Sequence, residues 1–135
     1  MPQPAQRHGR METTWDQLGW TTTPSGSKYS KLVMGVTEGD PHIFHVEFPP
    51  GARVAAHHHE SDYVEVIVRG RQRIGRAWHE EGSVRFVSAK QVYGPILTGD
   101  DGATVLLVFR DGRWPAVPAR SGDREGFHDE AAVKA

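Results

Sequence analysis

Apolar and polar residues alternate along the middle of the chain with a period of two, the pattern of a β-strand with one buried face. In the segment His42–Phe48, every second residue from Phe44 onward is apolar. In the segment Tyr63–Arg69, valines occupy one face, and Tyr63 and Glu65 share the other face with an isoleucine. Both segments therefore predict strands whose two faces have different surroundings.

Glycine and proline, 15 and 9 residues, recur at short intervals and divide this pattern into short segments. No stretch in the middle of the chain holds a helical period. The predicted strands are Tyr29–Val36, His42–Phe48, Arg53–His59, Tyr63–Arg69, Arg71–His79, Ser83–Val87 and Thr104–Phe109. Many short strands joined by turns predict an all-β fold, a small antiparallel β-barrel of six to eight strands.

The length of 135 residues indicates one domain, which we place at residues 11–112. Residues 1–10 are polar and contain proline, and we expect them to be disordered; Met11 is an alternative start. Residues 113–135 are rich in Pro, Ala, Ser, Gly and charges. We expect a flexible tail there, with a short helix near Glu130–Lys134.

Charge, cysteine content and the length of apolar runs exclude several classes of function. The formal net charge is -1 with both signs interspersed, so the sequence lacks the basic excess of a nucleic-acid-binding protein. The chain has no cysteine, which excludes disulfides, thiol catalysis and cysteine-ligated zinc. The longest apolar run, Val105–Phe109, is too short to cross a bilayer, and the N-terminal residues contain no apolar signal segment. We expect a cytoplasmic protein that binds a small molecule rather than nucleic acid or membrane.

Candidate chemistry is concentrated between Gly51 and Gly70. Side chains two apart on a strand share a face, so His57 and His59 point together and His58 points away. Two converging imidazoles are a natural start to a metal site, because neutral imidazole binds zinc, iron, copper and nickel. If the interior face of the next strand carries Tyr63 and Glu65, both project toward these histidines.

The spacing in this region resembles the first motif of the cupin superfamily: a glycine, five residues, His-x-His, three or four residues, glutamate, six residues and a glycine. Four residues fall in register: Gly51, His57, His59 and Gly70. Tyr63 stands at the glutamate position, and a carboxylate follows two residues later as Glu65.

The second cupin motif is degenerate. Gly82 fits its first position, but Ser88, Lys90 and Tyr93 replace the usual proline, glycine and histidine. The resemblance covers roughly residues 29–110.

This resemblance implies a cupin jelly roll, or double-stranded β-helix, with a divalent transition metal (Fe, Zn, Mn, Ni or Cu) in the barrel. The expected metal ligands are His57, His59 and Glu65. The expected catalytic residues are Glu65, as a third ligand or general base, and Tyr63 and Tyr93, as a ligand or proton-transfer partner. The implied activity is that of an enzyme acting on a small organic molecule by oxygenation, elimination or isomerisation.

Other interpretations stay open at this point. The chain could be a non-catalytic ligand-binding or sensing module, or a metal-free isomerase that uses histidines as bases. Glu65 could pair with Arg69, Arg71 or Arg73 on the outside of the sheet, and the tyrosines could simply pack in the core.

Two further surface interpretations concern strand faces. His45 and Glu47 suit a solvated face, and His79 suits a hairpin end at the surface. The valines at positions 64, 66 and 68 form a continuous apolar face opposite the proposed site, which predicts a homodimer.

Overall fold

The structure is a computed structural model that describes residues 9–23 and 26–120. Its elements are α1 (Trp15–Leu18), β1 (Thr21–Thr22), β2 (Lys28–Val33), β3 (His42–Phe48), β4 (Arg53–Val54), β5 (His57–His59), β6 (Tyr63–Ile74), β7 (Ala77–His79), β8 (Val84–Val87), β9 (Ile96–Phe109) and β10 (Ala116–Pro118). All strand pairings in the described part of the chain are antiparallel, as the alternation predicted.

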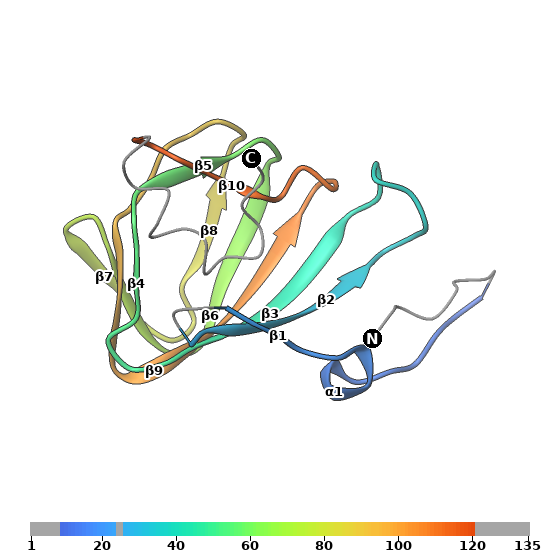
Figure 1. Ribbon diagram of the computed structural model, residues 1–135, viewed down its shortest axis with the longest axis horizontal. Coiled ribbons are helices and arrows are strands. Elements are labelled where there is room, and N and C mark those ends of the chain that lie inside the picture. Colours follow the sequence, from blue (N-terminus) through green and yellow to red (C-terminus); the bar gives the residue numbers. More distant parts are fainter. Residues whose placement is uncertain (1–8, 24–25, 121–135) are drawn as a thin grey trace.

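The main sheet has eight strands in the order β1-β2-β3-β9-β6-β7, with β4 also paired to β9 and β8 also paired to β6. The two long strands, β6 and β9, bend through the lower part of Figure 1 and join the two walls of the molecule. The short pair β5–β10 lies across the top in the same view. The fold is therefore an all-β jelly roll in which β3, β9, β6 and β8 lie side by side in one wall, with their inner side chains facing the interior.

The bend in β6 depends on a glycine. The register against β9 shifts on both sides of Gly70, whose φ is +81°, a conformation that side-chain-bearing residues rarely adopt. A Cβ at this position would collide with the backbone carbonyl of Gly102. The closing glycine of the first motif is thus required by a close approach of two backbones.

The core fills the space between the two walls. Its largest cluster contains Phe44, Val46, Tyr63, Val87 and Phe109. All five side chains sit on inward positions of strands, in agreement with the alternation in the sequence. The valines of β6 lie on the opposite, outer face, as expected.

Strand boundaries match the predictions to different degrees. Strand β3 has the bounds that the alternation predicted. The predicted strand Arg53–His59 is divided into β4 and β5, and β9 begins at Ile96, eight residues before the predicted Thr104.

The segment from Arg113 does not behave as the tail that its composition indicated. Ala116, Val117 and Pro118 pair with β5, and the Trp114 ring packs 4.7 Å from the ring of Phe44. Long-range pairing with the histidine strand therefore orders this segment despite its loop-like composition. The remaining predicted tail, residues 121–135, and the predicted helix within it lie outside the described residues, as do residues 1–8.

The outer face that carries His45 is also covered, contrary to the prediction of a solvated face. The His45 ring stacks on Trp15 at 5.4 Å, and Trp20 meets it edge-on at 5.4 Å. Helix α1 is capped by Thr14, whose hydroxyl accepts from the Gln17 amide, and this cap holds Trp15 in place. No helix in the described parts of the chain has the length and apolar character needed to cross a membrane.

Candidate functional site

The histidine strand β5 is fixed from both sides. The backbone N–H groups of His57 and Tyr93 each donate to the other residue's carbonyl, at 3.0 and 2.9 Å, and the opposite edge of β5 pairs with β10. His57 and His59 are only 4% and 7% exposed, and their ring centroids are 5.0 Å apart. His58 points away, with its Nε2 atom 3.1 Å from a carboxylate oxygen of Glu60. The structure therefore brings together the two histidines predicted to share a site.

Backbone carbonyls set the tautomer of both buried imidazoles. The Nδ1 atom of His57 is 2.8 Å from the Ala55 carbonyl oxygen, and the Nδ1 atom of His59 is 2.5 Å from the Trp114 carbonyl oxygen. Because a carbonyl oxygen only accepts, each Nδ1 atom carries the hydrogen and each Nε2 atom carries the lone pair.

Burial also keeps these rings neutral. Desolvation lowers the pKa of His57 to about 4 and the pKa of His59 to about 3, although the hydrogen bonds to Ala55 and Trp114 act in the opposite direction. At neutral pH both side chains are therefore in the form that binds a metal ion or accepts a proton.

Tyr63 and Glu65 lie on the inner face of β6, as the alternation predicted, and are 2% and 4% exposed. Glu65 is held by two partners: the Tyr93 hydroxyl donates to its Oε2 atom at 3.0 Å, and Arg85 Nη1 lies 3.5 Å from its Oε1 atom. Burial raises the pKa of Glu65 above its usual value, and Arg85 and then Tyr93 oppose this shift.

Aromatic rings enclose the two imidazoles. The His59 ring centroid lies 4.8 Å from that of Tyr63 and 5.0 Å from that of Phe109. The His57 ring centroid lies 5.0 Å from that of Tyr93. Tyr63 and Tyr93, the residues at the glutamate and second-motif histidine positions, thus pack directly against the two histidines.

The set of side chains that could bind a metal differs from the expected set, because it does not include Glu65. Among the residues that the structure describes, no three His, Cys, Asp or Glu side chains lie where they could hold one metal ion. Glu65 is instead bound to Tyr93 and Arg85, so it is not brought to the imidazoles as a third ligand. The Tyr63 hydroxyl is buried without a hydrogen-bond partner of standard geometry, although it lies close enough to the Tyr93 hydroxyl to affect its pKa. Two neutral imidazoles and an orphaned phenol are a donor set that suits a transition metal.

Arg85 was not singled out by the sequence as part of the site. It pairs with Glu65 in the β6–β8 ladder and shares the inward face of β8 with Val87, whereas Val84 and Phe86 are exposed. Its guanidinium carbon lies 4.9 Å from the Tyr93 ring centroid. The alternative in which Glu65 pairs with Arg69, Arg71 or Arg73 outside the sheet is therefore not what the structure shows, because its partner is Arg85 and the pair lies inside.

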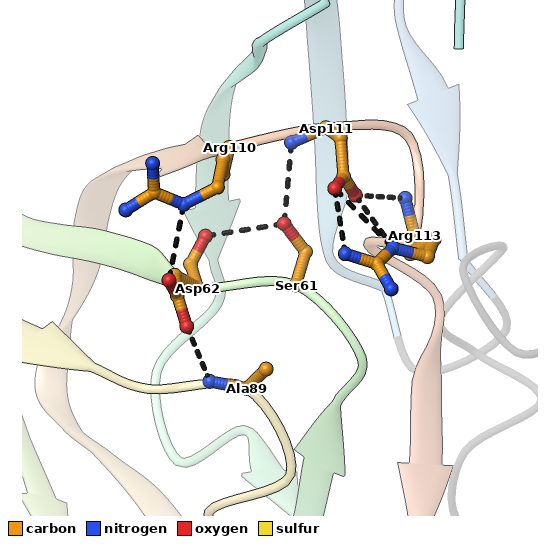
Figure 2. Close-up of polar contacts among 6 residues, drawn as sticks. All are labelled: Ser61, Asp62, Ala89, Arg110, Asp111 and Arg113. Carbon is orange, nitrogen blue, oxygen red and sulfur yellow. Dashed lines mark hydrogen bonds and ion pairs between the residues drawn. The ribbon is translucent and has the colours of Figure 1, made fainter. Parts of the chain in front are cut away.

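A polar network fixes the turn between His59 and Tyr63. Figure 2 shows Asp62 accepting from the Ala89 amide at 2.7 Å and from Arg110 Nε at 3.0 Å. In the same view, the buried Ser61 hydroxyl accepts from the Asp111 amide at 3.2 Å. This turn sets the relative position of β5 and β6. The alternation pattern carries no signal for it, since the partners are distant in sequence.

The sequence matches no protein-family model and no curated protein. Solved structures are similar in fold. A putative acetylacetone dioxygenase from Methylibium petroleiphilum is 14% identical with a TM-score of 0.66, covering 90% of this chain and 88% of that chain. An RmlC-like cupin protein from Ralstonia eutropha is 14% identical with a TM-score of 0.61, covering 80% of this chain and 71% of that chain.

Oxalate decarboxylase from Bacillus subtilis is 18% identical with a TM-score of 0.65, and 83% of this chain is covered. The match covers 33% of the oxalate decarboxylase chain, so this chain corresponds to about a third of that enzyme.

Proposed function

We propose, on the premise of the cupin fold that this chain shares with those structures, that it is a metal-dependent enzyme acting on a small organic molecule beside His57 and His59. The cupins of similar fold include proteins named as a decarboxylase and a putative dioxygenase, so enzymes of small molecules occur on this fold. Because fold does not determine reaction, the proposal rests on the site itself.

The observation that carries the proposal is the matched tautomer of the two buried histidines. Metal-binding histidines typically donate their second ring N–H to a carbonyl or carboxylate, which fixes the ring and directs the other nitrogen at the ion. His57 and His59 both have this arrangement, through the carbonyls of Ala55 and Trp114. The neutral state of both rings removes the competition from protons at neutral pH.

In this proposal His57 and His59 hold a divalent transition metal, and the phenol oxygen of Tyr63 is the adjacent donor from the protein. The metal, when bound, acts as a Lewis acid toward a substrate oxygen. Glu65 is the general base, because it is the buried carboxylate of the site and its raised pKa brings it closer to neutral pH. Tyr93 holds its proton in the hydrogen bond to Glu65 and positions the carboxylate.

Metal content of point variants tests the proposal, using protein prepared without a histidine tag. His57→Ala and His59→Ala should each remove most of the bound metal, because each imidazole is one of few protein ligands. His58→Ala is the matched control: the same residue type on the same strand, with its side chain on the opposite face. Equal metal content in all three variants would overturn the proposal.

A further inference from the structure

Three polar atoms of the site are buried and make no hydrogen bond of standard geometry: Tyr63 Oη, Glu65 Oε1 and Arg85 Nη1. Glu65 Oε1 and Arg85 Nη1 form only a long ion pair at 3.5 Å, and Tyr63 Oη lies near the Tyr93 hydroxyl. The three residues come from the inward positions of the adjacent strands β6 and β8. Buried polar atoms nearly always make hydrogen bonds in folded proteins. Three that make none, in one place, indicate a hydrogen-bonding partner from outside the chain.

The Arg85 guanidinium is held in place without using all of its donors. The face of the Tyr93 ring supports it at 4.9 Å, and Glu65 Oε1 lies 3.5 Å from Nη1, too poorly placed for a hydrogen bond. Its side chain is 20% exposed. Several other arginines of these hairpins, by contrast, are exposed: Arg69, Arg71 and Arg76. Arg85 is therefore a cation built into the inner wall.

The hydrogen-bonding capacity of these polar atoms indicates the chemical class of the ligand. Arg85 Nη1 only donates. A carboxylate oxygen accepts from it, and guanidinium groups bind carboxylates with matching geometry. The Tyr63 oxygen is left to the metal ion of the proposed function. Glu65 Oε1 requires a donor, which a hydroxyl beside the carboxylate would provide.

Charge balance leads to the same class of ligand, and this step rests on the proposed function. Glu65 offsets the charge of Arg85. The neutral imidazoles offset none of the charge of a divalent metal ion, and a phenolate at Tyr63 would offset only one of its two positive charges. A buried site with excess positive charge favours an anion. We propose that the substrate is a small hydroxycarboxylate and that Arg85 is the residue that binds its carboxylate.

The test compares lactate with lactamide, which have the same shape but differ in the negative charge, by NMR titration of the metal-loaded protein. Wild-type protein should bind lactate about tenfold more tightly than lactamide, as expected for a hydrogen bond between charged groups. Arg85→Gln should abolish this preference. Arg73→Gln is the matched control, since Arg73 lies outside on β6 and makes no ion pair with a described residue, and it should retain the preference.

Glu65→Gln separates ligand binding from a structural role of Arg85. If Arg85 binds the carboxylate, removing the neighbouring negative charge should tighten lactate binding. If Arg85 serves only as the counter-ion of Glu65, lactate affinity should not rise. Equal affinity of wild-type protein for lactate and lactamide, or no detectable lactate binding, would overturn the inference.

The same titration on metal-stripped protein distinguishes the proposal of a metal site from the proposal that Arg85 binds the substrate carboxylate. Loss of metal in His57→Ala with a retained preference for lactate would agree with both proposals. A wild-type protein that binds no metal but prefers lactate would contradict only the metal proposal. A protein that binds metal through His57 and His59 but does not distinguish the two probes would contradict only the role of Arg85.

Discussion

Each of the two site histidines is kept neutral by its burial, and this makes the stability of the fold depend on pH. The folded pKa of His57, about 4, lies below the ordinary value of 6.5. Below pH 6.5 the unfolded chain therefore binds more protons than the folded chain. The stability contributed by the neutral imidazole is fully present above pH 6.5 and is lost as the pH falls toward 4. His59 behaves in the same way with a pKa of about 3.

We predict that metal-free protein loses stability between pH 6.5 and 4, by about 3 kcal/mol through His57 alone. His57→Gln cannot be protonated in this range, so its unfolding free energy should depend less steeply on pH. Urea unfolding at a series of pH values measures the difference. Identical pH dependence in the variant and wild-type protein would show that burial does not control this histidine.

Glu65→Gln tests whether the carboxylate coordinates the metal. Because Glu65 is bound to Tyr93 and Arg85 rather than grouped with the imidazoles, the variant should retain its metal. Elemental analysis beside wild-type protein measures this. A large loss of metal would place Glu65 in the ligand set, as the resemblance to the cupin motif implied.

At the residue scale, the sequence predicted which candidate residues lie close together but not all of their contacts. The spacing from Gly51 to Gly70 identified His57 and His59 and placed Glu65 on the inner face, because strand periodicity alone determines those directions. The partners of these residues could not be predicted. Arg85 and the carbonyl of Trp114 reach the site through pairing between strands distant in sequence.

Among the elements, strand β6 depends on the backbone conformation of Gly70. Gly70→Ala would introduce a side chain where φ is +81° and the Gly102 carbonyl is in contact. Gly82→Ala is the control, because its φ is +91° but a Cβ there meets no atom within 4 Å. Both changes carry the cost of a left-handed conformation, about 1–2 kcal/mol. Gly70→Ala should cost measurably more than Gly82→Ala in urea unfolding, and equal costs would contradict the close approach.

The elements that the sequence predicted well are those with strict alternation. Strand β3 has one buried face and was predicted with its exact bounds. Strand β9 was predicted too short because its beginning contains Thr98, Asp100 and Asp101, which resemble a loop in composition. Strand β10 was missed because only its pairing with β5 makes it a strand. Local pattern therefore predicts strands that bury one face, whereas tertiary pairing decides the others.

On the scale of the whole molecule, one outer face has no cover within the described chain. Val84 and Phe86 on β8 are 67% and 64% exposed, and Val68 and Val108 on neighbouring strands are exposed as well. The register places Val64 beside Phe86 and Val108, so these side chains form a continuous apolar surface. Exposed apolar surfaces of this kind are typical of interaction sites.

We predict a homodimer that buries this face, as the valine pattern indicated. Phe86→Glu would place a charge at the centre of the interface and should give a monomer in sedimentation velocity experiments, without loss of the fold. Val36→Glu is the control, because Val36 is a more exposed valine on a loop outside this face. A monomeric wild-type protein at high micromolar concentration would contradict the dimer.

The central claim, that His57 and His59 present their Nε2 atoms to one metal ion, is tested most directly by 15N NMR of protein labelled at histidine. Before metal is added, both residues should show the tautomer with hydrogen on Nδ1, since the Ala55 and Trp114 carbonyls require it. Addition of Zn²⁺ should then shift the Nε2 resonances of His57 and His59 and leave that of His58 unchanged. Hydrogen on Nε2 of either buried ring, or an equal response of all three histidines, would contradict the account.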